Sequence, residues 1–439
     1  MPVAARSIGE AFVTIAGRDR VRDDAGARAA AAVDGQLPRW VVRPASIDQL
    51  SRIVALAHDD GLVVVPRGGG SALELGRPPA RVDVVVDLSG LDQVLEYNPD
   101  DLTITVQAGI TAGALAALLA PRRQFLALDP PGAATRTLGG MTATNATGPL
   151  RVRYGTMRDL LLGVRFVQAD GVVTWGGSKV VKSVSGYDVP KLMVGALGTL
   201  GVLGELTLRL HPLPDAERSW LVVLASSEAA QAFVERVIAS PLQPNRIEFF
   251  NDRALRSVLV EGAAAGVAVS IGSVAEAVRT QGEHLGTLAT AEGARVVPLS
   301  EGFWSRAARA SMPEANETVL HVASLAGRLA ATERAIGDAV RTASPGAEIS
   351  LSGCAGLGTF RVLVGHASAA EMAVATAGLR AWLVELKGSV VIARGSAELR
   401  KAVDPWGPLE AGPFALMRAL KDEFDAKRVL NPGRFVGGL

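Results

Sequence analysis

The chain has 439 residues, of which 49% are hydrophobic and 20% charged, enough to bury a core in two or three domains. Its 45 Lys and Arg side chains balance 44 Asp and Glu side chains, and this net charge of +1, without a basic tract, argues against nucleic-acid binding. A single cysteine, Cys354, excludes an internal disulfide and any zinc or iron–sulfur site built from cysteines. The apolar stretch 262–275 is too short to span a membrane, and the first residues lack a signal-peptide pattern. We therefore expect a globular, cytoplasmic protein without a transmembrane segment.

The first half of the chain alternates short apolar strands with glycine-rich loops. A helix is predicted over 46–60, because Ser46 and Gln49 have the capping-box spacing and apolar residues recur on one face. Buried strands are predicted where apolar runs are short and continuous, and hairpins where two alternating runs flank a turn. The further predicted elements are strands at 62–65 and 82–88, hairpins at 94–109 and 160–175, and a helix at 111–119.

After Pro214 the pattern changes to strand-like runs and alanine-rich helices, without clustered glycines or an internal repeat. An amphipathic helix around 414–424 and an Asn-Pro-Gly-Arg turn close the chain. We predict an N-terminal extension, a first large domain, a second domain and a C-terminal segment, with bounds 1–35, 36–214, 215–402 and 403–439. The strand-like runs of the second domain are 220–224, 361–364 and 390–393, and its helical stretches are 229–238 and 369–386.

Glycine is in excess, with 48 residues or about 11% of the chain against an average near 7%. The clusters, at 68–70, 139–140, 176–177 and 195–204, all precede residue 215. Glycine costs backbone entropy, so such clusters indicate tight turns or close approach to a ligand. The loop 67–71 offers consecutive N–H groups that suit a pyrophosphate, and the loop 137–148 adds hydroxyl and amide groups. Together they favour a large ligand with a diphosphate and flat rings.

Several familiar sites are absent from the sequence. The glycines match neither the Rossmann dinucleotide pattern nor the P-loop, and there is no hydrolase nucleophile elbow. The five histidines stand alone, so we predict no metal site. Cys354 is interpreted as a small buried residue rather than a nucleophile.

The segments PRGGGS, TLGGMTATNATG and GGSKVVKSVSGYDVPKLMVGALGTLGVLGELTLRLHP occur in this order within 36–214. This order resembles the FAD-binding domain of the vanillyl-alcohol oxidase and p-cresol methylhydroxylase (PCMH) type. The tail, from DPWGP to LNPGRFVGGL, resembles the end of the FAD-binding subunit of bacterial glycolate oxidase. The resemblance implies an α+β fold: a PCMH-type FAD-binding domain of two α+β subdomains, a second α/β cap domain, and a C-terminal segment that returns to the flavin domain.

The resemblance also implies which residues bind FAD. The first loop would wrap the pyrophosphate, the second would line the diphosphate and flavin, and the tail asparagine would return to the flavin edge. Lys182, one of only seven lysines, would be a cation beside the flavin pyrimidine or else a solvated loop residue. The implied cofactor-binding residues are Arg67, Gly68, Gly69, Gly70, Ser71, Gly139, Gly140, Thr144, Asn145, Gly148, Tyr154, Gly155, Lys182, Gly198, Gly201, Val202 and Asn431.

The sequence also departs from its relatives. No histidine or cysteine stands in these loops to attach the flavin, so FAD is expected to be non-covalent. Relatives that oxidise 2-hydroxy acids carry clustered histidines and a glutamate in the second domain, whereas His321 and His366 are lone residues here. They are candidates for the base by residue type only, and the catalytic residue stays unknown. Arg361 and Arg394 are candidates for binding a substrate carboxylate.

The resemblance implies an FAD-dependent oxidoreductase acting on CH–OH groups, the flavin subunit of a glycolate oxidase-like 2-hydroxy acid dehydrogenase complex. Its partners would be a second FAD subunit and an iron–sulfur subunit, which could place it at the inner membrane. One hypothesis is that this chain relays electrons while a partner oxidises the substrate. The alternatives are a self-sufficient FAD-linked oxidase or dehydrogenase of another alcohol or hydroxy acid, and a non-catalytic assembly subunit.

Overall fold

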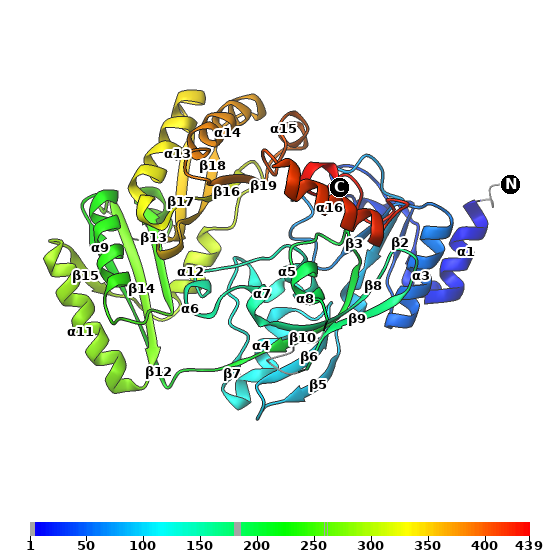
Figure 1. The fold of residues 1–439 in the computed structure, drawn as a ribbon, viewed down its shortest axis with the longest axis horizontal. Coiled ribbons are helices and arrows are strands. Elements are labelled where there is room, and N and C mark those ends of the chain that lie inside the picture. The colour runs from blue at the N-terminus through cyan, green and yellow to red at the C-terminus, as the bar shows by residue number, and fades with distance from the viewer. Residues whose placement is uncertain (1–4, 180–185, 259, 261) are drawn as a thin grey trace.

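The computed structural model describes residues 5–179, 186–258, 260 and 262–439 (Figure 1). Within these residues the chain forms sheets of four, five, two and eight strands. The four- and five-stranded sheets and the small two-stranded sheet precede residue 215, and the eight-stranded sheet follows it. No helix of the described residues has both the length and the apolar composition needed to cross a membrane.

The four-stranded sheet has the order β1-β2-β4-β3, and its last three strands are parallel. α1 and α3 pack on it, and Ser46 caps α3 as predicted, although the side chain of Gln49 accepts from the N–H of Ala45 rather than from the cap. β3 starts two residues later than expected, because the N–H of Leu62 still donates to Ala57 at the end of α3. The elements are α1 (Ala5–Ala16), β1 (Val21–Arg22), α2 (Ala25–Ala30), β2 (Trp40–Val42), α3 (Ile47–Asp59), β3 (Val64–Arg67) and β4 (Val84–Asp87).

The five-stranded sheet is antiparallel, with the order β5-β6-β10-β8-β9. Both predicted hairpins are confirmed, as β5–β6 and β8–β9, and so is the helix that follows the first of them. Short helices lie between the strands, and α5 contains Gly139 and Gly140 of the second glycine loop. The elements are β5 (Val94–Asn98), β6 (Thr103–Gln107), α4 (Ala112–Leu119), β7 (Gln124–Phe125), α5 (Leu138–Ala143), α6 (Arg151–Tyr154), α7 (Met157–Leu160), β8 (Leu161–Val167), β9 (Val173–Gly177), α8 (Val189–Met193), β10 (Val202–Arg209) and β11 (His211–Pro212).

The eight-stranded sheet has the order β15-β12-β14-β13-β17-β18-β16-β19, and neighbouring strands are antiparallel. It consists of two units that share the βαββαβ order and meet where β13 pairs with β17. The helices α9, α11, α13 and α14 cover one face over the largest apolar core (Figure 1). The apolar stretch that is too short for a membrane forms β14. The elements are β12 (Ala216–Leu224), α9 (Ser227–Ala239), β13 (Arg246–Asn251), α10 (Asp252–Ser257), β14 (Ala265–Ser273), α11 (Ala275–Ala291), β15 (Arg295–Pro298), α12 (Phe303–Ala310), β16 (Thr318–Ala323), α13 (Leu329–Ala343), β17 (Glu348–Cys354), β18 (Thr359–Gly365), α14 (Ala369–Leu383) and β19 (Ser389–Arg394).

The C-terminal segment, with α15 (Ala397–Ala402) and α16 (Ala411–Phe424), returns to the four-stranded sheet (Figure 1). The N–H of Val64 donates to Val429 at 2.8 Å, and the N–H of Asn431 donates back to Val64 at 2.9 Å. The tail therefore extends the edge of the sheet at β3, directly before the first glycine loop.

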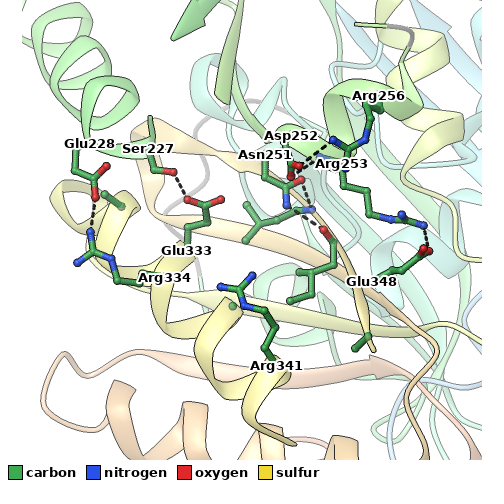
Figure 2. A pocket seen from close by; sticks show the side chains of 15 residues that line it. Ser227, Glu228, Asn251, Asp252, Arg253, Arg256, Glu333, Arg334, Arg341 and Glu348 are labelled. Atoms are coloured by element: carbon green, nitrogen blue, oxygen red, sulfur yellow. Dashed lines mark hydrogen bonds and ion pairs between the residues drawn. The ribbon is translucent and has the colours of Figure 1, made fainter. Parts of the chain in front are cut away.

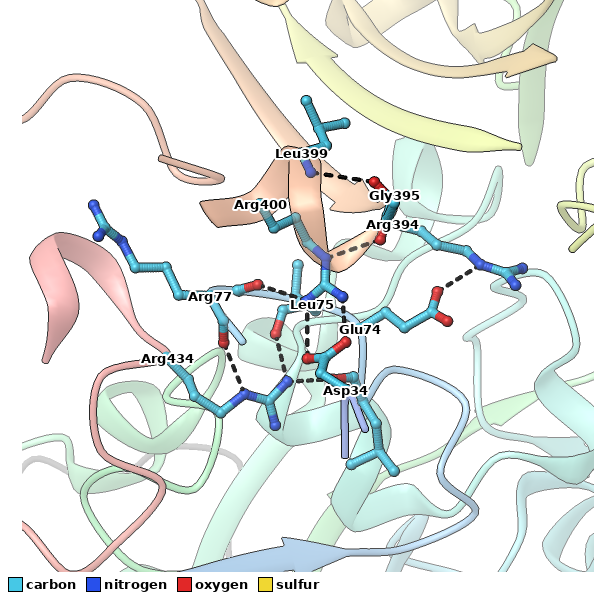
Figure 3. A network of polar contacts seen from close by, with 12 residues as sticks. Asp34, Glu74, Leu75, Arg77, Arg394, Gly395, Leu399, Arg400 and Arg434 are labelled. Carbon is cyan, nitrogen blue, oxygen red and sulfur yellow. Dashed lines mark hydrogen bonds and ion pairs between the residues drawn. The ribbon is translucent and has the colours of Figure 1, made fainter. Parts of the chain in front are cut away.

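A buried polar network fixes this return (Figure 3). Arg400, 2% exposed, forms an ion pair with Asp34 and donates to the carbonyl of Gly76 at 3.0 Å. Arg434 donates to the carbonyl of Leu75 at 2.9 Å. The network thus joins α15 and the tail to the segment that follows the first glycine loop.

Candidate functional site

The first glycine loop leaves β3 and packs against the start of α5. A Cβ added at Gly68 would overlap Oγ1 of Thr137, which caps α5 by accepting from the N–H of Gly140 at 3.2 Å. In the described part of the chain, the N–H groups of residues 68–71 donate to no protein acceptor. Consecutive free N–H groups on a bare backbone form a concave anion site. The loop therefore keeps donors available for phosphate oxygens.

The second loop, 137–148, uses its glycines for close packing. A Cβ at Gly139 would lie 2.8 Å from that of Ala108, and one at Gly148 would overlap the carbonyl oxygen of Asp129. Asn145 adopts a left-handed conformation, with φ of 46°. The loop can approach its neighbours this closely only with a nearly bare backbone.

The loop before β10, residues 195–201 (the third loop), and the tail meet the second loop. The N–H of Leu197 donates to Ala143 at 2.9 Å, and a Cβ at Gly198 would lie 3.0 Å from Cγ of Pro66, just before the first loop. Nδ2 of Asn431 donates to the carbonyl of Leu197 at 2.7 Å. The structure therefore brings together segments around residues 68, 140, 197 and 431, which are far apart in the sequence.

Lys421 on α16 holds this junction and was missed by the sequence analysis. Its Nζ donates to the carbonyls of Thr199 at 2.7 Å and Leu430 at 3.0 Å, and pairs with Asp425 at 2.5 Å. Burial lowers the pKa of Lys421, while Asp425 acts in the opposite direction. A lysine four residues before an aspartate on a helix leading into the Leu-Asn-Pro-Gly turn was the available signal.

Two further expected residues, Gly201 and Val202, direct their side-chain positions into the sheet core, whereas the prediction for them concerns their backbone. Gly201 and Val202 lie at the start of β10, and a Cβ at Gly201 would lie 2.5 Å from the ring of Phe166. Val202 is completely buried in the core of the four-stranded sheet. Their side-chain positions therefore face packed residues.

The other expected residues make contacts of their own. Nη1 of Arg67 donates to the carbonyl of Ala30 at 2.8 Å. Tyr154 packs edge-on against Phe125 and His211, with ring centroids 5.5 and 4.8 Å away. Gly155, with a φ of 78°, ends α6, and Thr144 Oγ1 donates within its own helix. Lys182 lies outside the described residues.

In the eight-stranded sheet, which forms the cap domain, His321 on β16 lies opposite Arg361 on β18. Nη1 of Arg361 lies 2.9 Å from Nε2 of His321, and its Nε donates to the carbonyl of Ser311 at 2.9 Å. The imidazole can be reached by solvent, yet burial, with Arg361 and two further arginines, lowers the pKa of His321 to about 3. Because arginine only donates, Nε2 of a neutral His321 accepts and Nδ1 carries the proton.

Arg136 and Arg151, which precede the cap in the sequence, lie near enough to His321 to lower its pKa, and no sequence pattern pointed to either of them. Each has a buried Nε without a hydrogen-bond partner. Burial, together with Arg136 and Arg394, lowers the pKa of Arg361 to about 10. In the described part of the chain, neither Arg136, Arg151 nor Arg361 forms an ion pair with a carboxylate. This face therefore carries positive charge that the protein itself does not neutralise.

Two carboxyl groups lie near these arginines, but neither forms an ion pair with them. Asp129 pairs with Arg246 at 3.0 Å and accepts from the N–H of Leu150. Glu248 is buried, and burial together with Asp129 raises its pKa well above the usual value. Burial also raises the pKa of Cys354 to about 12, so the thiol remains protonated at neutral pH, as expected for a small buried residue.

The other two candidate residues, Arg394 and His366, do not form part of the pair made by His321 and Arg361. Nε of Arg394 pairs with Glu74 at 2.6 Å and thereby links β19 to the segment after the first glycine loop (Figure 3). His366 lies at the other end of the cap strands, exposed and 3.6 Å from Glu348. The structure thus joins His321 with Arg361 and excludes His366 from this group.

Two family matches follow each other along the chain, an FAD binding domain over residues 38–177 and the C-terminal domain of FAD linked oxidases over residues 280–435. The chain contains both domains of the FAD-linked oxidases. FAD is its cofactor, and the protein is an FAD-linked oxidoreductase.

The relatives of this FAD-linked oxidoreductase include named dehydrogenases. A D-2-hydroxyglutarate dehydrogenase of Xanthomonas citri pv. viticola is 29% identical over 90% of this chain and 89% of its own length. The glycolate oxidase subunit GlcD of Bacillus subtilis is 29% identical over 57% of this chain, which is 54% of that protein. A D-lactate dehydrogenase of Archaeoglobus fulgidus is 35% identical over 49% of this chain and 48% of that protein.

Solved structures share the fold. p-Cresol methylhydroxylase with bound substrate has a TM-score of 0.78 at 15% identity, covering 98% of this chain and 96% of that one. An alkyldihydroxyacetonephosphate synthase has a TM-score of 0.77 at 18% identity, covering 99% and 87%. The expected α+β fold with a PCMH-type FAD-binding domain is therefore confirmed.

The residues present fit FAD. The unpaired N–H groups of 68–71 match the oxygens of a pyrophosphate, and their bare backbone leaves no side chain in the way. In the third loop and the tail, Gly198 and Asn431 adopt left-handed conformations that hold these segments in place.

Gly68 provides a direct test of this fit. We expect Gly68→Ala to raise the Kd for FAD at least about tenfold, because the new methyl group and Thr137 would compete for one position, at a cost above about 1.4 kcal/mol. Flavin fluorescence titration of the apoprotein measures this. Gly286→Ala, on α11 with nothing near its added Cβ, is the control and should bind FAD like the unmodified chain. Equal affinities in both variants would contradict a close fit at Gly68.

Proposed function

We propose that this chain oxidises a small 2-hydroxy acid, and that the arginines on the cap face bind the substrate carboxylate. The observation that carries the proposal is the uncompensated positive charge of Arg136, Arg151 and Arg361 beside the FAD-binding loops. Guanidinium groups match carboxylates in a bidentate geometry, and a desolvated guanidinium without an acidic partner favours an anionic ligand.

The printed names of the relatives support the same substrate class. D-2-hydroxyglutarate, glycolate and D-lactate, which appear in those names, are all 2-hydroxy acids. They differ in the group attached to the carbinol carbon and share a carboxylate next to it. A site that recognises the shared part needs cations, and Arg361 and Arg136 supply them.

The reaction converts the 2-hydroxy acid to a 2-oxo acid and removes two electrons and two protons. FAD, when bound, would accept the electron pair together with one proton, and the other proton would pass to solvent. Arg361 and Arg136 would hold the carboxylate and orient the adjacent carbon. His321 remains neutral at physiological pH because burial and the arginines suppress its protonation, so it adds no further positive charge to the face.

An anaerobic spectral titration tests the proposal. The FAD-loaded chain is mixed with glycolate, D-lactate or D-2-hydroxyglutarate, and we expect at least one acid to bleach the visible flavin absorption. D-Lactamide, in which an uncharged amide replaces the carboxylate, is the matched control for D-lactate and should leave the flavin oxidised.

Each other outcome favours one alternative. A flavin that resists all three acids but bleaches with dithionite would favour electron relay within a complex, with the proposed second FAD subunit and iron–sulfur subunit as partners. Equal reduction by D-lactate and D-lactamide would favour a self-sufficient oxidase of other alcohols. A purified chain that does not bind added FAD would favour an assembly role.

A further inference from the structure

A second site lies in the cap, away from the FAD-binding loops. A cavity of about 440 Å³ opens where the two βαββαβ units meet, between α9, α10, α13 and β17 (Figure 2). Four arginines and four carboxylates line it, beside small apolar residues such as Ala330 and Ala347. Its volume falls within the usual range for small-molecule sites, about 300–1,000 Å³.

Most of these charges are already paired with each other. Three of the arginines each contact one carboxylate, as the dashed lines in Figure 2 show. The pairs are Arg253–Glu348, Arg256–Asp252 and Arg334–Glu228. These pairs define the walls of the cavity and leave one carboxyl and one guanidinium without an ion-pair partner among the other lining residues.

Glu333 and Arg341 are the remaining two, and both stand on α13. Glu333 accepts a hydrogen bond from the hydroxyl of Ser227. Among the described residues, Arg341 forms its one ion pair with Asp338, which is 3.7 Å away and outside the lining. Burial raises the pKa of Glu333, and Arg341 is near enough to act in the opposite direction. In Figure 2 the guanidinium of Arg341 has no dashed line to any neighbour.

Gly337 lies between these two residues on the same helix face. Spacings of four residues place Glu333, Gly337 and Arg341 one above the other, about 6 Å apart along the axis. A Cβ at Gly337 would overlap the guanidinium of Arg341. The absent side chain therefore allows Arg341 to fold back toward Glu333 and leaves the helix bare between the two charges.

The balance of charge indicates the class of ligand. A simple anion would gain from Arg341 but be repelled by Glu333, and a simple cation would meet the reverse. A small molecule with a carboxylate and an ammonium group satisfies both, because a guanidinium binds the carboxylate and a carboxylate binds the ammonium. We propose that this cavity is a binding site for a zwitterionic amino acid, with Arg341 on its carboxylate and Glu333 on its ammonium group. The proposal goes beyond the oxidation of 2-hydroxy acids and does not depend on it.

Thermal-shift and calorimetric titrations of the FAD-loaded full chain test it, with the twenty L-amino acids as probes and with acetate and ethylammonium as single-charge controls. We expect at least one amino acid to bind, and acetate or ethylammonium alone to bind at least about tenfold more weakly. Arg341→Gln and Glu333→Gln should each weaken binding at least about tenfold, the effect of losing one charge-assisted hydrogen bond. Gly337→Ala should also weaken it, since the added methyl group displaces Arg341 without removing a charge.

Arg279→Gln is the matched control, because Arg279 forms only exposed ion pairs on α11 and does not line the cavity. It should bind the amino acid like the unmodified chain. The proposal is overturned if no amino acid binds, if acetate alone binds as tightly, or if Arg341→Gln and Glu333→Gln both retain full affinity. It is also overturned if binding disappears in Arg361→Met, because the ligand would then occupy the cap face that holds His321.

Discussion

Replacing Arg361 with methionine is expected to lower kcat/KM for the 2-hydroxy acid about 100-fold, mostly through KM. The substitution removes a charged donor from the carboxylate in both the bound substrate and the transition state, a loss of about 3 kcal/mol. Arg361→Lys should recover part of this loss, since lysine keeps the charge but cannot bind the carboxylate in a bidentate geometry. Steady-state kinetics with the acid identified by the spectral titration measure both effects.

A second measurement separates charge from structural damage. Arg361 is one of the neighbours that lower the pKa of His321, so the pKa of this imidazole should rise from about 3 in Arg361→Met while burial still keeps it below its ordinary value. Nuclear magnetic resonance of the histidine side chains follows this shift. Arg309→Met, an exposed arginine on α12, is the control and should change neither kcat/KM nor the pKa. Unchanged kcat/KM in Arg361→Met would refute carboxylate binding by this residue.

The sequence predicts most of the fold before residue 215, because its signals there are local. Turn residues between alternating runs set the two hairpins, and Ser46 sets the start of α3. β3 was placed two residues early because a run of apolar residues does not show which of them still hydrogen-bonds to the preceding helix. The start of β3 is set by hydrogen bonds to segments that lie next to it in the fold, which the local sequence does not show.

The cap was harder to predict. The sequence shows no repeat there, yet the structure contains two units with the same βαββαβ order. Strand order is set by pairing between distant segments, such as β13 with β17, and such pairing leaves no local pattern. The two units share an arrangement of elements rather than a run of residues.

Some parts of the candidate site could be predicted from the sequence and others could not. Glycine loops could be recognised because a bare backbone needs consecutive glycines, which are visible in any single sequence. Arg136 and Arg151 could not, since arginine is common in this chain and their proposed function depends on their lying near Arg361 and His321, which come from the other domain. Lys421 was missed for a related reason: its surface-like spacing with Asp425 conceals that both side chains are almost completely buried.

Lys421→Met is expected to destabilise the protein by about 3–5 kcal/mol and to release FAD. The substitution removes one partner of a buried ion pair and leaves the carboxylate of Asp425 supported only by the N–H groups of Val429 and Leu430. It also frees the carbonyl of Thr199 in the third loop, so the tail and the loop should loosen together. Denaturant unfolding of the apoprotein and the Kd for FAD measure the two effects separately.

Two further variants decide whether the buried pair is responsible. Lys427→Met removes an exposed lysine whose Nζ only donates to the carbonyl of His58 at 3.2 Å, and it should stay within about 0.5 kcal/mol of the unmodified chain. Adding Asp425→Asn to Lys421→Met should restore part of the stability, because the unpaired buried charge is removed. FAD affinity should remain weak in this double variant, since Thr199 and Leu430 are still not joined. An unchanged Kd for FAD in Lys421→Met would instead mean that the third loop keeps its position without α16.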